Sequence, residues 1–181
     1  MRELSLHILD LIENAIRAGA TVISVTVEEK VEGDLISLAI EDDGPGLPVS
    51  AERATDPFYT TKDGKKTGLG LSMIKFRTEQ AGGRFLLGVS KLGGVAVHAS
   101  MPLSSVDRSP LGDLAATIAS VVVTNPDVDV RSVLRAGGKE WTVSSADIAR
   151  RLPVGARSDI VVAREVRQRI TEGLSALHMA E

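Results

Sequence analysis

The sequence predicts an α/β protein of the α+β kind, with one domain in residues 1–103 and a small α+β extension in residues 104–181. Two observations support this class. Two segments of the first domain repeat apolar residues with the period of a helix, and four shorter segments alternate apolar and polar residues as strands do. The chain has 181 residues, of which 43% are hydrophobic. That length allows a domain of about 100 residues with a real core, plus an appendage.

A helix is predicted over residues 3–18, because its apolar residues gather on one broad face and Gly19 follows as a C-terminal stop. Residues 22–27 and 35–40 alternate apolar and polar side chains, which is typical of strands. The turn-like residues 32–34 separate them. The first three predicted elements are therefore a helix and a hairpin.

Residues 42–70 are rich in Gly, Pro, Lys and Thr and predict a long loop, with one short helix near 49–54. Loops of this length commonly carry function. A helical pattern resumes over residues 69–80 and stops at a glycine pair. Two further strands are predicted at 84–90 and 95–102.

In the extension, residues 104–110 are predicted to be a connector that leads into a helix. Ser109 and Pro110 suit the N-cap and first position of that helix, which runs through residues 114–123. The later elements are a hairpin and two helices, predicted at 128–134, at 139–143, from 145, and at 159–177. We match the extension to no functional motif.

Composition excludes several classes of function. The formal net charge is −3 and the charges are mixed, so no basic face suits nucleic acid. There are no cysteines, which excludes disulfides and zinc-thiolate sites. The N-terminus lacks the pattern of a signal peptide, and the apolar stretch at 114–123 is too short to span a bilayer. We therefore expect a cytoplasmic protein that binds neither membrane nor nucleic acid.

One polar stripe follows the first predicted helix. Its members are spaced 4, 3, 4 and 3 residues apart and therefore share one face: Glu3, His7, Asp10, Asn14 and Arg17. Such a stripe is either a solvated surface or a set of groups that point at one ligand. We expect His7 to lie at the surface or behind the site, because no phosphoacceptor pattern surrounds it.

A carboxylate and two glycines follow the second predicted strand, in the pattern Asp42-x-Gly44-x-Gly46. Glycines permit a positive φ and a close approach of the backbone, and a carboxylate at a strand end accepts an amine donor. The alternative is an ordinary Asp-Gly turn.

A second glycine motif leads directly into the helix predicted from residue 69. It comprises Thr67, Gly68, Leu69, Gly70 and Leu71. The free N–H groups and positive end of that helix suit phosphate. The segment is not a Walker A loop, because the required upstream glycine is replaced by Tyr59, and it is not a Rossmann motif, because Met73 stands where the third glycine belongs.

Taken in order, these motifs and the segment Asp56-Pro57-Phe58-Tyr59-Thr60-Thr61-Lys62 resemble the N, G1, F and G2 boxes of the GHKL nucleotide-binding family. The sequences of these motifs are most similar to those of the ATP-binding domain of histidine kinases. The resemblance covers residues 3–103 and implies a Bergerat-type ATP fold. That fold is a two-layer sandwich, in which helices cover one face of a mixed, mostly antiparallel sheet.

The resemblance implies a role for each matching residue. Asn14 would hold Mg²⁺ against the phosphates of ATP, Asp42 would accept the adenine amine, and Asp10 would stand where hydrolysing relatives have a catalytic base. The residues implied to bind ATP are Asn14, Arg17, Asp42, Gly44, Gly46, Phe58, Lys62, Thr67, Gly68, Leu69, Gly70 and Leu71.

Two departures from the family pattern matter for function. Asp10 is one methylene shorter than the usual Glu, which sets its carboxylate back and places hydrolysis in doubt. Val95 stands where many relatives have Thr. The motif helix also begins close to residue 1, so we expect no phosphoacceptor segment before it.

Three functions remain open. The first is an ATP-binding regulatory protein that phosphorylates a separate protein partner, or binds it in a nucleotide-dependent way. The second is a slow Mg²⁺-dependent ATPase switch with Asp10 as base, and the third is a non-enzymatic ATP sensor. A homodimer stabilised by the extension is compatible with each.

Overall fold

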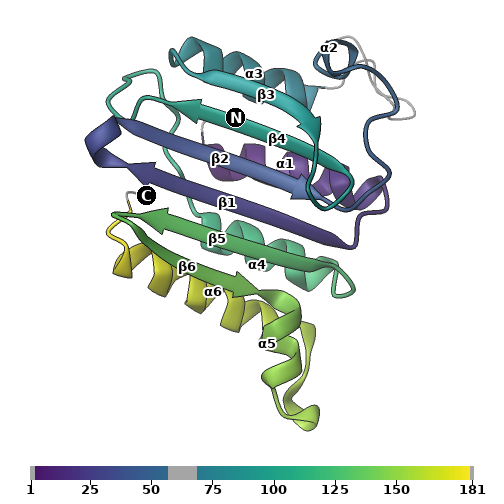
Figure 1. The fold of residues 1–181 in the computed structure, drawn as a ribbon. Coiled ribbons are helices and arrows are strands. Elements are labelled where there is room, and N and C mark those ends of the chain that lie inside the picture. The colour runs from purple at the N-terminus through teal and green to yellow at the C-terminus, as the bar shows by residue number, and fades with distance from the viewer. Residues whose placement is uncertain (1–2, 57–68, 180–181) are drawn as a thin grey trace.

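The computed structural model describes residues 3–56 and 69–179, which form a six-stranded sheet with helices packed on one face (Figure 1). The helices are α1 (Leu4–Arg17), α2 (Ala51–Ala54), α3 (Leu69–Gln80), α4 (Leu114–Thr124), α5 (Ser145–Arg151) and α6 (Asp159–Ala176). The strands are β1 (Val22–Lys30), β2 (Leu35–Asp42), β3 (Arg84–Val89), β4 (Val95–Met101), β5 (Asp129–Ala136) and β6 (Lys139–Ser144). Two short 3-10 turns lie at Val31–Gly33 and Val154–Ala156. The predicted two-layer sandwich with a mixed sheet is confirmed.

The strand order is β3-β4-β2-β1-β5-β6. All neighbours are antiparallel except β1 and β5, which run parallel. The parallel pair requires a crossover, and the segment that contains α4 supplies it. Residues 104–181 therefore continue the same sheet through β5 and β6, and α4 and α6 extend the same helical layer (Figure 1).

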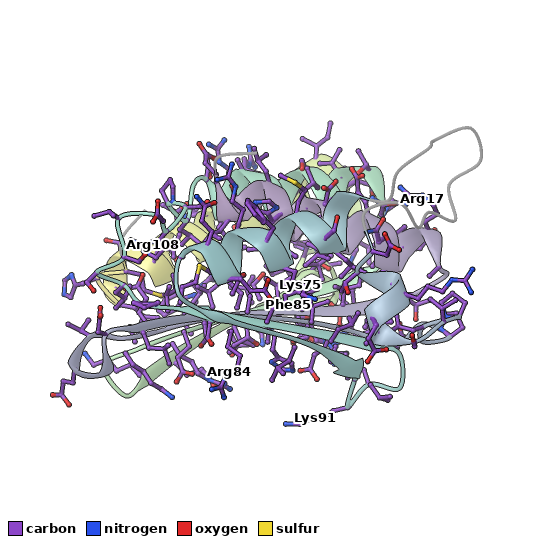
Figure 2. All side chains as sticks on the ribbon, turned by 90° about the horizontal axis from the view of Figure 1, so that it is seen from above. Arg17, Lys75, Arg84, Phe85, Lys91 and Arg108 are labelled. Atoms are coloured by element: carbon purple, nitrogen blue, oxygen red, sulfur yellow. The ribbon has the colours of Figure 1, made fainter. Side chains whose placement is uncertain are left out.

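Side chains alternate strictly across the sheet. In β1, Ile23, Val25 and Val27 are buried under the helices, and the residues between them are only partly buried on the other face. We call the side covered by α1, α3, α4 and α6 the helix face and the other side the open face; in Figure 2 the helices lie above the sheet and the open face below it. Within the described residues, one continuous apolar core fills the space between helices and sheet.

The predicted strands and helices all occur, with shifted ends. β1 and β2 are longer than predicted, because the ladder continues through the polar pairs Glu28–Ser37 and Ser24–Glu41. Backbone pairing does not require apolar side chains, so alternation alone underestimates a strand. No helix in the described ranges is long and apolar enough to cross a bilayer.

The prediction that Ser109 and Pro110 begin the fourth helix is wrong. α4 begins at Leu114, and its N-cap is Asp113, whose Oδ1 accepts the N–H of Ala116 at 2.8 Å. A serine followed by proline has the right local chemistry for a helix start, but here the carbonyl of Pro110 bonds another element.

That element is α1, whose first turn has N–H groups without partners inside the helix. The carbonyl of Pro110 accepts the N–H of Leu4 at 2.9 Å, and the carbonyl of Leu111 accepts the N–H of Ser5 at 2.8 Å. Glu3 provides no side-chain cap. The connector therefore completes the N-terminus of α1, and this contact ties the extension to the helix that carries the polar stripe.

A tight contact between α6 and β6 generates the first prediction. A Cβ added to Gly173 would lie 2.7 Å from Cγ of Trp141. Gly173→Ala should therefore destabilise the fold by about 1–3 kcal/mol through overpacking, although alanine is the better helix former by about 1 kcal/mol. Urea unfolding measures the difference, with the exposed Ser175→Ala on the same helix as the control. Equal or greater stability of Gly173→Ala would contradict the contact.

Candidate functional site

A cavity of about 390 Å³ opens between α1, the end of β2, the start of α3 and strand β4. Its wall is largely apolar, and a few polar groups enter it from α1 and β2. The residues that line it are Leu11, Asn14, Ala15, Arg17, Ala18, Ile40, Asp42, Pro45, Gly46, Leu47, Pro48, Val49, Ala54, Gly70, Leu71, Val95 and Val97. A concave, mostly apolar cavity with few convergent polar groups is typical of a small-molecule site.

Asp42 is the buried anchor of this cavity. Its side chain is 7% exposed, and its Oδ1 accepts the N–H of Gly44 at 2.9 Å and the N–H of Val95 at 3.2 Å. The other oxygen, Oδ2, has no donor among the described residues. One side of the carboxylate is therefore fixed by backbone, and the other is available to a donor on a ligand.

The backbone around Asp42 is packed so closely that one glycine is obligatory. The N–H of Gly94 donates to the carbonyl of Asp42 at 2.9 Å. A Cβ at Gly94 would lie 2.6 Å from the nitrogen of Gly44 and would overlap Oδ1 of Asp42. Sequence reasoning missed Gly94, although the Gly-Gly pair before β4 was its visible signal. Gly46 is also required for its conformation, since its φ is +83°.

Asp43 fixes the same turn from the other side, and sequence reasoning missed this role too. Its Oδ1 accepts the N–H groups of Thr21 at 2.7 Å and Val22 at 2.9 Å, and its Oδ2 accepts the Thr21 hydroxyl at 2.7 Å. Desolvation would raise the pKa of Asp43, but these hydrogen bonds outweigh it and hold the pKa below its ordinary value. The turn after β2 is thus clamped to the start of β1.

Asn14 and Arg17 line the cavity from α1, one turn apart. The guanidinium Nη1 of Arg17 donates to Oδ1 of Asn14 at 2.9 Å. This oxygen is the one that the resemblance assigns to Mg²⁺, a hard cation that prefers oxygen ligands. Arg17 therefore engages one of the two lone pairs of that oxygen.

Asp10 lies where α1 crosses the start of α3. A Cβ on Gly70 would lie 3.3 Å from Nδ2 of Asn14 and 3.6 Å from Oδ2 of Asp10. Gly70 thus lets α3 approach both side chains at contact distance, while Leu71 lines the cavity and Leu69 begins the helix. Asp10 and Asn14, in the middle of the polar stripe, are therefore covered by a second helix and are not simply solvated surface, whereas Arg17 is exposed.

Four residues assigned to the site by the resemblance lie outside the described residues: Phe58, Lys62, Thr67 and Gly68. Their assignment stays a prediction. Of the others, the structure brings Asn14, Arg17, Asp42, Gly46, Gly70 and Leu71 to the cavity wall, with Gly44 bonded to Asp42.

His7 is buried, at 1% exposed, so of its two expected positions the surface is excluded and a position behind the site remains. Neither ring nitrogen has a hydrogen-bond partner, and the same holds for Nε of the nearby Arg77 on α3. Burial lowers the pKa of His7 below its ordinary value of 6.5, and the charge of Arg77 acts in the same direction. His7 is consequently a neutral residue packed between α1 and α3.

The polar groups that line the cavity suit a nucleotide whose divalent cation is held mainly by the nucleotide itself. Within the described ranges, no three acidic or histidine side chains converge as a metal site. Mg²⁺ commonly binds phosphates and water together with one or two protein oxygens. Asn14 supplies such an oxygen at the cavity mouth, and Asp42 supplies an acceptor at its base.

Comparisons with known proteins identify a family and related sequences. The family described as "Histidine kinase-, DNA gyrase B-, and HSP90-like ATPase" matches residues 2–105. The sensor protein kinase CarS of Pseudomonas aeruginosa is 33% identical over 102 residues, which cover 55% of this chain and 22% of CarS. The sensor kinase CckA of Brucella abortus is 46% identical over 54 residues, which cover 29% of this chain and 6% of CckA.

Among solved structures, the N-terminal domain of a DNA repair protein superposes with a TM-score of 0.51 at 13% identity, covering 79% of this chain and 52% of that one. At this identity the likeness concerns the fold alone. The chain spans less than a quarter of the length of the two sensor kinases, CarS and CckA.

The buried imidazole predicts a pH dependence of stability. Its pKa is lower in the folded protein than in the unfolded chain, so the unfolded state binds the proton first and stability falls as the pH drops below 6.5. His7→Leu should lose less stability than the parent between pH 7 and pH 5, measured by urea unfolding at each pH. His98→Gln, an exposed histidine, is the control. If the stability of His7→Leu and that of the parent fell equally with pH, the prediction would be wrong.

Proposed function

This chain belongs to the histidine kinase-, DNA gyrase B- and HSP90-like ATPase family, and we propose that it binds ATP in the cavity between α1 and α3 to regulate a separate protein. The observation that carries this proposal is the geometry of Asp42. A buried carboxylate with one oxygen fixed by two backbone N–H groups and the other free is suited to accept the exocyclic amine of adenine. The apolar cavity wall, with Ile40 and Val97, suits the flat face of the base.

The phosphates are proposed to lie toward α1 and the first turn of α3. Arg17 is exposed at the cavity mouth and carries the positive charge there. The N–H groups at the start of a helix suit phosphate oxygens, and α3 begins at this cavity. Asn14 would contribute its Oδ1 to Mg²⁺, which neutralises phosphate charge, and Arg17 would move from Asn14 to a phosphate as it does so.

Transfer of the terminal phosphate to a protein in trans is the activity that the site supports best. The chain has three histidines, and all lie in the described residues. His7 is buried between two helices, His98 is on the open face of β4, and His178 follows α6; none lines the cavity. We therefore propose that the acceptor belongs to a separate protein.

A slow ATPase switch is the second candidate, and the position of Asp10 favours it. Its carboxylate lies beside Asn14 at the crossing of α1 and α3, and it has no hydrogen bond within the described part of the chain. A free carboxylate near the phosphates is placed to take a proton from water. Its short side chain weakens this role, because a misplacement of about 1 Å strongly reduces proton transfer.

Asp42→Asn tests the nucleotide site directly. The amide cannot accept both the backbone N–H groups and the adenine amine, so affinity for ATP should fall at least about tenfold, from the loss of a charged hydrogen bond worth about 1.5–3 kcal/mol. Calorimetric titration of Mg-ATP measures it. Glu41→Gln is the matched control, because it neutralises the next carboxylate of the same strand on the open face. Unchanged ATP affinity in Asp42→Asn would refute the adenine assignment.

Asp10→Asn separates the two activities. If the protein acts as a kinase in trans, the parent protein should bind γ-labelled ATP and release little free phosphate. The affinity of Asp10→Asn for ATP should lie within about twofold of the parent affinity, because Asp10 contributes to a transition state and not to binding. Glu13→Gln, exposed on the same helix, is the control. Steady release of phosphate that disappears only in Asp10→Asn would instead establish the ATPase switch.

A further inference from the structure

We propose that the chain forms a symmetric homodimer in which edge strand β3 pairs antiparallel with β3 of a second copy. β3 is the terminal strand of the sheet and pairs only with β4 within the described residues. An unpaired strand edge presents a row of free N–H and C=O groups that can template another strand. This proposal does not depend on the nucleotide site.

The free groups of β3 can be assigned by alternation. The N–H of Ser90 donates to the carbonyl of Gly94 across the β3–β4 turn, so alternate residues back along the strand also face β4. The N–H and C=O groups of Phe85, Leu87 and Val89 consequently point outward, to the free edge. They are available to a second strand.

The side chains of this edge are unusually apolar for an exposed strand. Leu86 is 58% exposed and Val89 is 84% exposed, and the strand has no charge after Arg84. The other edge strand, β6, differs: Lys139, Glu140 and Thr142 are exposed, and Glu140 pairs with Arg135. Native edges are usually protected by charges, so an exposed apolar edge indicates a covered one.

The β3 edge is complementary to itself when Leu86 is placed on the two-fold axis of the dimer. Arg84 then lies opposite Gly88 of the second copy, because antiparallel partners keep a constant sum of residue numbers. Each copy has a row of neighbouring residues that runs from Gly88 through Ala96, which is 4% exposed, to Glu41. A Cβ at Gly88 would meet nothing within 4 Å, so the surface there is clear.

Arg84 can therefore extend across Gly88 and Ala96 toward Glu41 of the other copy. The Cα atoms would be three strand spacings, or about 14 Å, apart, which extended arginine and glutamate side chains together span. Within the described residues, Arg84 has no ion pair, and the Glu41 carboxylate accepts only the backbone N–H of Lys91, at 3.4 Å. Figure 2 shows Arg84 and Lys91 on the open side of the sheet and Phe85 close to the sheet itself.

The symmetry doubles each contact. Two Arg84–Glu41 pairs would flank the central Leu86 pair, and about four main-chain hydrogen bonds would join Phe85 and Leu87 of the two copies. Leu86 lies at a non-hydrogen-bonded position, where opposite side chains approach most closely. This is an isologous interface, in which one patch is its own complement.

Single-cysteine cross-linking tests the register, because the chain has no cysteine of its own. Leu86→Cys places two thiols across the two-fold axis at a Cα separation of about 4.5–5.5 Å, which suits a disulfide. Mild oxidation should give a covalent dimer. The matched control is Thr142→Cys, exposed on β6 at the other edge, which should stay monomeric under denaturing electrophoresis. Cross-linking of both variants alike, or of neither, overturns the proposal.

Charge reversal tests the complementarity. Light scattering over a dilution series should show the parent protein at twice the monomer mass of 19.1 kDa. Arg84→Glu and Glu41→Arg should each raise the dimer dissociation constant about tenfold, and the double variant should restore it, because the reversed pair still attracts. A parent protein that is monomeric at every concentration, or a double variant weaker than both single variants, overturns the proposal. Circular dichroism of each variant verifies that it is folded.

Discussion

The carboxylate of Asp42 is the constraint on which the site depends. A buried carboxylate costs several kcal/mol unless hydrogen bonds compensate it. Here the N–H groups of Gly44 and Val95 provide them, so the turn after β2 and the start of β4 must both approach the same oxygen. That convergence leaves no room for a side chain at Gly94. The base of the cavity is therefore set by backbone atoms, and the free oxygen of Asp42 has a fixed direction.

The helix α1 connects this site to the remainder of the molecule. One face of it contributes to the core through residues such as Ile8 and Ile12, and the other carries Asp10 and Asn14. Its first N–H groups are satisfied by carbonyls of the connector before α4, at Pro110 and Leu111. α1 is thus completed by the extension, and the described residues 104–179 support the site without contributing a residue to the cavity wall.

A second set of hydrogen bonds connects the turn after β2 to the extension. Asp43 holds Thr21, and the carbonyl of Thr21 accepts the N–H of Asp129 at the start of β5. Desolvation would raise the pKa of Asp129, but hydrogen bonds from Arg131, Ala146 and Ser144 outweigh it and lower the pKa. These bonds position the first turn of α5 beside the start of β5. A contiguous hydrogen-bonded path therefore leads from the cavity to the extension, and β4 leads from the cavity to edge strand β3 on the other side.

Local pattern in the sequence determined the helices and strands, since apolar periodicity depends only on which residues must be buried. The order of four short motifs also identified the nucleotide family and some of the cavity residues, including Asn14, Asp42 and Gly70. The start of α4 was mispredicted, because Pro110 has the chemistry of a helix start while its carbonyl is engaged by α1. Only the tertiary structure decided that His7 is buried, that Arg17 engages the oxygen of Asn14, and that Gly94 abuts Asp42. The burial of His7 and the contact of Gly94 depend on segments distant in sequence, and the hydrogen bond of Arg17 depends on a choice of side-chain conformation, so no local pattern encodes them.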